Sequence, residues 1–153
     1  LGAERRLAGY RRALASADIA FDPSLVVEAG FSAGVGRRAL SSWLKKHRGS
    51  ALPDAIFCAS DPMAVGCLEA LAESGLRVPE DVSVTGFDDS LAARTTNPQL
   101  TTVRQPLRMM GMKAVESLLA RIQQHQGHAE HTEPKPVVFP VELVTRASVK
   151  NLR

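Results

Sequence analysis

The stretch that decides the fold is Val78-Pro79-Glu80-Asp81-Val82-Ser83-Val84-Thr85-Gly86-Phe87-Asp88-Asp89. It begins as the exit from a helix, continues as a buried strand over residues 82–87 and ends in two carboxylates. In an open α/β sheet, ligands bind just outside the carboxyl ends of the strands. The stretch therefore predicts a parallel sheet with a binding site near Asp88.

A second stretch follows closely and predicts a short strand. It is Pro98-Gln99-Leu100-Thr101-Thr102-Val103-Arg104-Gln105-Pro106. Proline cannot donate to a ladder and so is excluded from the middle of a sheet, which places the two prolines at the ends of this strand.

Helix and strand patterns alternate along the rest of the chain, and this predicts βαβ units with a parallel sheet. The expected helices span 4–16, 34–47, 62–74 and 107–123. Further strands are expected at 25–30, 55–60 and 137–144. The strand at 55–60 is apolar throughout, as fully buried parallel strands are. Pro140 confines the last strand to a sheet edge or a bulge.

Length and composition are those of one globular core, with 153 residues, 44% hydrophobic and 23% charged. The net charge of +3 is mild, and the densest basic run is expected to be the wet side of one helix: Arg37, Arg38, Lys45, Lys46, His47 and Arg48. No apolar run approaches the roughly 20 residues that cross a membrane. Cys58 and Cys67 show no metal-ligand spacing, which favours a reducing compartment.

No catalytic motif is visible, so we expect a binding protein and not an enzyme. Asp88 and Asp89 are adjacent, and on extended backbone they would point to opposite sides, which makes them a poor acid/base pair. One could face a cleft while the other anchors the loop, or both could be turn residues. The loop at 123–136 carries His125, His128 and His131, for which we favour solvated side chains over a metal site. No cofactor is expected.

Five further segments carry a family resemblance. They are Arg6-Leu7-Ala8-Gly9-Tyr10, Gly30-Phe31-Ser32, Ala59-Ser60-Asp61-Pro62-Met63-Ala64-Val65-Gly66, Leu143-Val144-Thr145-Arg146-Ala147-Ser148 and the Leu-Thr-Thr-Val-Arg-Gln run at 100–105. With the Val-Pro-x-Asp-Val-Ser-Val-x-Gly-Phe-Asp run at 78–88, the chain resembles the effector-binding domain of the lactose-repressor (LacI/GalR) family of bacterial transcription regulators.

The resemblance implies a fold and a division of the chain. The fold is α/β and periplasmic-binding-protein-like (type I), a three-layer arrangement with a parallel sheet flanked by helices. Residues 1–104 and 137–150 would form most of the C-terminal lobe, and 105–136 would cross to the other lobe. We expect the DNA-binding domain, most of the N-terminal lobe and the first strand of the C-terminal lobe to be absent from the chain.

The resemblance also implies six effector-binding residues. Arg6 would donate to hydroxyls or carbonyls, and Asp88 would accept from two neighbouring hydroxyls. Phe31 would stack on an apolar sugar or base face. Ser60 and Asp61 would line the pocket. The sixth residue, at the crossover between the lobes, is Gln105.

Three of these positions have simpler alternatives. Arg6 could be an exposed first-turn residue, and Phe31 could belong to the core. Ser60 stands where the family usually has asparagine, and it could serve only as a helix cap.

Helix 62–74 is apolar almost all the way round, which indicates burial on more than one side. One side should pack on its own sheet, and a partner subunit could cover the second. The resemblance implies a homodimer surface here, formed by Met63, Val65, Glu69, Ala72 and Leu91. The alternative is a helix buried within one chain.

Helix 107–123 has an apolar side, yet the lobe that it should cover is expected to be mostly absent. We expect the helix to pack on a second copy, to swap between copies or to fold back onto its own lobe. The alternative is poor order.

These observations predict an effector sensor in a cytoplasmic LacI-type transcription regulator. A small molecule, a sugar or sugar derivative, would bind between the lobes and change the affinity of the attached domain for operator DNA. The alternative is a periplasmic sugar-binding protein of a transporter. Against it stand the run at 100–105, the free cysteines and the lack of a visible signal peptide.

Overall fold

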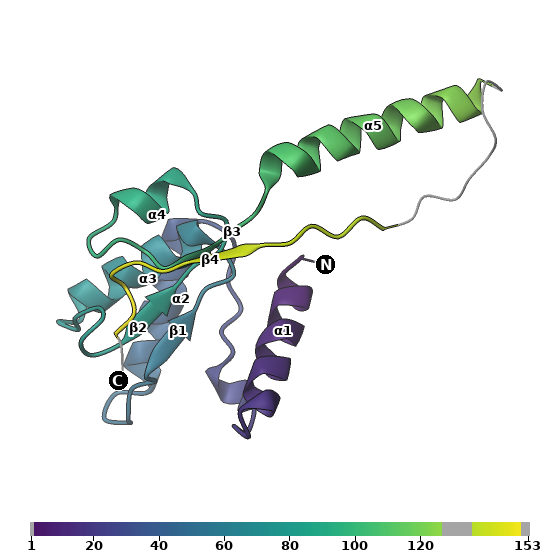
Figure 1. The fold of residues 1–153 in the computed structure, drawn as a ribbon. Helices are drawn as coiled ribbons and strands as arrows, with labels where there is room; N and C mark the ends of the chain where they lie inside the picture. The colour runs from purple at the N-terminus through teal and green to yellow at the C-terminus, as the bar shows by residue number, and fades with distance from the viewer. Residues whose placement is uncertain (1, 127–135, 151–153) are drawn as a thin grey trace.

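The computed structural model describes residues 2–126 and 136–150, in which one long helix projects away from the other elements (Figure 1). Ten elements follow one another within these residues. They are α1 (Gly2–Ser16), the 3-10 helix η1 (Pro23–Leu25), α2 (Ala33–Lys46), β1 (Ala55–Phe57), α3 (Asp61–Glu73), β2 (Ser83–Thr85), α4 (Leu91–Thr95), β3 (Thr102–Arg104), α5 (Leu107–His125) and β4 (Glu142–Val144).

The strands form two pairs, and isolated backbone bridges connect one pair to the other. β1 runs parallel to β2, with Ile56 opposite Val84, and β3 runs antiparallel to β4. Isolated parallel bridges, Thr85 to Thr101 and Asp88 to Arg104, link the segment of β3 to the end of β2. The parallel α/β arrangement is therefore confirmed, although its sheet is narrow.

Helices lie on both faces of the parallel pair, but only α2 and α3 pack a buried core against it. Successive side chains of a strand point to opposite faces. Ile56 packs against the core that α2 and α3 share, whereas the ring of Phe57 stacks on Tyr10 of α1 at a centroid distance of 6.3 Å. The result is a three-layer body of α1, the strands and the α2–α3 pair.

The α2–α3 pair is the tightest contact of the body, and glycine makes it possible. A methyl group at Gly66 would overlap the carbonyl oxygen of Ala33, and one at Gly36 would lie 2.8 Å from the carbonyl oxygen of Met63. The two backbones therefore touch, and the two helices run in the same direction. The core beneath them contains the fully buried Leu71 and Val84.

Two strand predictions need correction. The chain is not a strand at 25–30: Asp22 accepts from the amide of Ser24 at 2.8 Å and caps a 3-10 turn that Pro23 begins, and no ladder partner lies beside it among residues 2–126 and 136–150. β1 is parallel, as predicted, but it is not fully buried. Phe57 is 43% exposed, because β2 is the one strand that pairs with β1 in the described part of the chain.

The prediction that helix 62–74 is buried on more than one side is confirmed. α3 buries residues toward the strands and, through Gly66, toward α2. Part of the cover expected from a partner subunit thus comes from within the chain. Three of the expected interface residues remain exposed, namely Glu69, Ala72 and Leu91, whereas Met63 and Val65 are half-buried.

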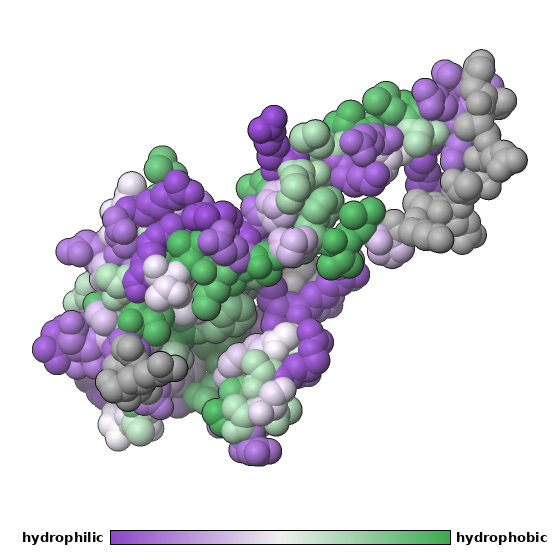
Figure 2. Space-filling view, in the orientation of Figure 1, coloured by the Kyte–Doolittle hydropathy of each residue, from purple (hydrophilic) through white to green (hydrophobic). Residues whose placement is uncertain are grey.

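α5 confirms the helix predicted at 107–123, and of the three forms of cover expected for it the structure excludes the fold-back. It has no buried residue and projects away from the body (Figure 1). Apolar and charged side chains both lie open along it (Figure 2). Its exposed apolar residues are Leu107, Met109, Met110, Met112, Val115, Leu118, Leu119 and Ile122. His125 ends the helix, whereas His128 and His131 lie outside the described residues.

Within residues 2–126 and 136–150, no group of three His, Cys, Asp or Glu side chains is placed to hold a metal ion. The same part of the chain contains no helix with the length and apolarity needed to cross a membrane.

Candidate functional site

The candidate site lies where the parallel strands end and two helices begin. Ser60 follows β1, and its hydroxyl accepts from the amide of Met63 at 3.4 Å, which caps α3. Ser32 caps α2 in the same way at the amide of Val35. Because α2 and α3 are parallel neighbours, both helix starts lie at this end of the body.

Asp88 is the centre of the site. Its side chain follows β2 and is 34% exposed. The amide nitrogen Nε2 of Gln105 donates to its Oδ1 at 2.6 Å. The Nη2 of Arg6 lies 3.8 Å from the same oxygen. Three elements, α1, the end of β2 and the exit from β3, thus bring together three of the six predicted effector-binding residues.

Arg6 is held from three directions, which excludes the alternative of a merely exposed first-turn residue. Besides its ion pair with Asp88, it donates to the carbonyl oxygen of Ala59. Its guanidinium carbon lies 3.9 Å from the ring centroid of Phe87, a cation–π geometry. The side chain is only 21% exposed. Arg6 therefore presents a fixed set of donors to the site.

The charge of Asp88 is tuned by its surroundings. Burial raises the pKa of this carboxyl above its ordinary value, while Arg6 and the hydrogen bond from Gln105 act in the opposite direction, and nearby Asp61 adds to the increase. The carboxylate can accept about four hydrogen bonds in all, and the contacts from Arg6 and Gln105 converge on one of its oxygens.

Asp61 does not line the site, and that prediction is corrected. Its side chain has no exposed surface. Its Oδ2 accepts from the amide of Ser90 at 2.7 Å, and its Oδ1 accepts from the hydroxyl of Thr102 at 2.6 Å. Gly86 leaves room for this carboxylate, since a methyl group there would overlap Oδ1. Asp61 instead joins α3 to the strand ends from within.

Ser60 is buried, whereas Phe31 is exposed. Ser60 is 3% exposed, so its hydroxyl serves as the cap of α3, the alternative that the sequence left open. Phe31 lies in the loop before α2 and is 57% exposed, which excludes a place in the core. Its ring is not among the groups that hold Arg6, Asp88 and Gln105.

Sequence reasoning missed the partners of Asp89. The carboxylate is 1% exposed and is held by three arginines: Arg94 at 3.0 Å, Arg104 at 2.7 Å and Arg146 at 2.5 Å. Burial alone would raise the pKa of Asp89, but the hydrogen bonds from the arginines outweigh it and hold the pKa well below the ordinary range. Asp88 and Asp89 thus have different partners, as expected if one faces the site while the other anchors the loop, although their φ angles of 117° and 52° show that the backbone there is not extended.

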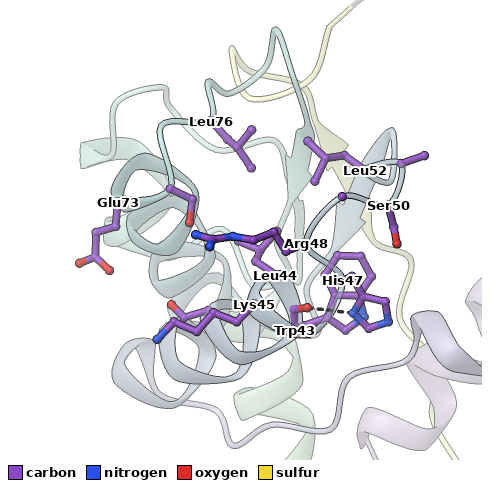
Figure 3. Close-up of a pocket in the computed structure, with 13 residues that line it drawn as sticks. Trp43, Leu44, Lys45, His47, Arg48, Ser50, Leu52, Glu73 and Leu76 are labelled. Atoms are coloured by element: carbon purple, nitrogen blue, oxygen red, sulfur yellow. Dashed lines mark hydrogen bonds between the residues drawn. The ribbon is translucent and has the colours of Figure 1, made fainter.

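A cavity lies elsewhere in the body and is not lined by the residues of the site. It has a volume of about 660 Å³ and lies at the carboxyl ends of α2 and α3, beside Trp43, His47 and Glu73 (Figure 3). Trp43 is partly buried against the core there, and its ring stacks on His47 at 4.2 Å. The candidate site is at the opposite end of these helices and is open.

What the site offers is hydrogen bonding to a polar ligand. A fixed guanidinium, a half-buried carboxylate and a primary amide supply both donors and acceptors within one small region. Specific ligand sites combine a few such convergent polar groups with apolar walls.

Comparison with known proteins places the chain in a family. Residues 2–149 match the family described as periplasmic binding protein-like domain. The chain is 36% identical to the HTH-type transcriptional repressor PurR of Glaesserella parasuis, over 98% of its own length and 44% of that protein. It is 43% identical to the ribose operon repressor of Haemophilus influenzae, over 99% of its length and 43% of that protein. The chain thus spans less than half the length of these curated relatives.

Solved structures agree. The transcriptional regulator CelR in complex with cellobiose matches with a TM-score of 0.83 at 38% identity, over 94% of this chain and 41% of that one. The lac repressor dimer bound to operator and the anti-inducer ONPF matches with a TM-score of 0.79 at 35% identity, over 97% and 48%. The chain therefore belongs to the periplasmic binding protein-like domain family.

Proposed function

We propose that this chain forms most of one lobe of the effector-sensing domain of a LacI-type transcription regulator. A small polar effector, a sugar or sugar derivative, binds at Asp88. The observation that carries the proposal is the convergence of Arg6, Asp88 and Gln105 from three separate elements. Relatives named as repressors, matched over nearly the whole chain, support it.

Each residue has a distinct part in binding. Asp88 accepts from neighbouring hydroxyls of the effector, and Arg6 donates to its oxygens from a position already fixed by Phe87 and Ala59. The exposed ring of Phe31 offers a flat apolar surface for a sugar face. Ser60 and Asp61 act indirectly, by holding the start of α3 and the strand ends in place.

A second wall of the site comes from another lobe. In this proposal residues 1–104 and 137–150 belong to the C-terminal lobe, and 105–136 cross to the N-terminal one, to which α5 would belong. The effector changes operator affinity only if it binds two lobe arrangements unequally. Operator DNA is contacted through a separate domain outside this chain, and the protein acts in the cytoplasm by binding and not by catalysis.

The open face of α3 and the start of α4 form the proposed homodimer surface. Leu91 is 77% exposed there, beside Glu69, Ala72 and the half-buried Met63 and Val65. A two-fold interface would repeat this patch on both subunits. Leu91→Arg in the full-length protein should yield monomers by light scattering, while Leu25→Arg, at a 50% exposed position in η1, should leave the dimer intact. A dimeric Leu91→Arg protein would place the interface elsewhere.

Binding is tested by calorimetry on the full-length protein with a panel of neutral sugars that includes D-ribose and cellobiose. Asp88→Ala should weaken binding of the sugar that the wild type takes up by about 5- to 150-fold, equivalent to about 1–3 kcal/mol. Asp81→Ala, at a surface carboxylate paired with Arg77, is the control and should bind normally. Unchanged affinity of Asp88→Ala would remove Asp88 from the site, and no binding of any sugar would reject the ligand class.

A periplasmic sugar-binding protein of a transporter would share the fold. The relatives named as repressors oppose this alternative. Cell fractionation distinguishes the two functions. Recovery of the full-length protein in the periplasm would overturn the proposal that it is a transcription regulator.

A further inference from the structure

We infer that Asp89 is a positioning residue that links the effector site to α4, β3 and β4. With Arg94, Arg104 and Arg146 it forms a group that we call the Asp89 clamp. The inference rests on the proposed function, because it describes how occupation of Asp88 reaches the rest of the lobe.

The clamp gathers segments that are far apart in the chain. Arg94 comes from α4, Arg104 from the end of β3, and Arg146 from just after β4. All three donate to one carboxylate that is 1% exposed. Arg104 also donates to Glu142 of β4 at 2.9 Å, and through Arg104 this strand is linked to Asp89. Hydrogen bonds between ionised groups are about twice as strong as neutral ones.

The clamp and the site share the same two backbone segments, residues 103–105 and residues 88–89. Gln105 donates to Asp88, and the residue before it, Arg104, donates to the residue after Asp88. Between these two side-chain bonds, the amide of Asp88 donates to the carbonyl oxygen of Val103 at 2.9 Å. A shift of the strand exit at Gln105 therefore also moves Arg104 against Asp89.

The backbone conformation at Asp88 and Asp89 leaves the site and the clamp little freedom to move independently. Asp88 has a φ of 117° and Asp89 a φ of 52°, both in the left-handed region that residues with a side chain seldom adopt. Such a conformation persists only where its surroundings fix it. Here the surroundings are the Asp88–Gln105 bond on one side and the three arginines on the other.

A ligand hydroxyl that takes the place of the Gln105 amide on Asp88 would thus release the exit of β3. The displacement reaches Arg104, then Asp89, and from there Arg94 on α4. Because α4 carries Leu91 of the proposed dimer surface, the clamp connects the effector to the contact between subunits.

The first test needs no ligand. It measures hydrogen exchange at the Asp88 amide in the full-length protein, relative to the core amide of Val84. Arg94→Gln removes one arm of the clamp at a side chain that is 55% exposed, so the protein should fold. Although Arg94 is not among the partners of Asp88, exchange there should rise about 2- to 30-fold, the range of long-distance coupling effects.

The matched variants make the result specific. Arg94→Lys keeps the charge and should restore most of the protection. Arg77→Gln makes the same change at a surface arginine bonded to Asp81 and should leave the Asp88 amide as it was. Unchanged exchange in Arg94→Gln, or an equal rise in Arg77→Gln, would overturn the inference.

The second test uses D-ribose or cellobiose, whichever the wild type binds. Asp89→Asn and the wild type are each measured with and without a sugar concentration that saturates them, because the variant should also bind the sugar more weakly. In Asp89→Asn the change in exchange that the sugar causes at the amides of residues 91–96 should be lost. A sugar-induced change that persists in Asp89→Asn would show that α4 is reached by another route. If neither sugar binds, the sugar proposal fails, and the Arg94 test still decides on the clamp.

Discussion

α3 and α5 are both rich in apolar residues, yet they have opposite fates in the structure. α3 buries residues against α2 and against the strands, whereas α5 buries none. Apolar content thus predicts that a helix needs cover, but it does not show whether the cover lies in the same chain. In the proposed function, α5 finds its cover in the other lobe.

The largest expected difference between the two helices follows from removing one leucine in each. Leu71 is fully buried in α3, so Leu71→Ala should lower the free energy of unfolding by about 2–5 kcal/mol. Leu118 of α5 is 59% exposed, and Leu118→Ala should stay within about 0.5 kcal/mol of the wild type. Urea denaturation of this chain measures both.

The same two variants sharpen the comparison in the full-length protein. If the other lobe covers α5, Leu118→Ala should there become about as costly as Leu71→Ala, again about 2–5 kcal/mol. A Leu118→Ala variant that is as stable as the wild type in both contexts would show that the apolar side of α5 stays uncovered.

A smaller effect is expected from the glycines of the two helices. Gly66→Ala would place a methyl group against the backbone of α2 and should destabilise the body by about 1–3 kcal/mol or more. Gly111 of α5 has no neighbouring atom within 4 Å of an added methyl group. Gly111→Ala should therefore stabilise α5 by about 0.5–1 kcal/mol. Circular dichroism and urea denaturation separate the two signs, and a neutral Gly66→Ala would mean that α2 and α3 can move apart freely.

The smallest effect is expected in the response to acid. The pKa of Asp89 lies below its unfolded value of about 3.9, so the stability that it contributes is present above that pH and is lost as the pH falls toward the folded pKa. Unfolding measured between about pH 5 and pH 2 should therefore depend less on pH in Asp89→Asn than in the wild type. Glu116 of α5, in an exposed pair with Lys113, is the control, and Glu116→Gln should not alter the curve. If the free energy of unfolding depended on pH equally in Asp89→Asn and in the wild type, the ion pairs of Asp89 would not be the acid-sensitive contact.

Much of the fold could be predicted from local patterns. The helix expected at 34–47 is Ala33–Lys46, and the helix expected at 62–74 is Asp61–Glu73, because caps and apolar spacing act over a few residues. The strand at 25–30 failed because Asp22 and Pro23 favour a capped turn that no neighbouring strand opposes. Pattern alone does not supply a ladder partner.

The site was predictable only in part, and the reason is distance along the chain. Arg6 and Gln105 were named through resemblance, and the structure places both at Asp88. The burial of Asp61 and the three arginines around Asp89 could not be read from spacing, because their partners are brought together only by the finished fold. The adjacent carboxylates gave one usable signal, namely that only one of them could face a ligand.

The antiparallel pairing of β3 and β4 has a further consequence for protein engineering. Arg104 lies opposite Glu142, so the chain leaves the body and returns to it at neighbouring positions, about 5 Å apart as in any sheet. The segment between these two residues can therefore be regarded as an insertion into the body. A two-residue Asn-Gly turn has the reach to replace it, since such turns join adjacent antiparallel strands. The body could thus be made as a miniature scaffold with a continuous hairpin, and other segments could be grafted at the same junction.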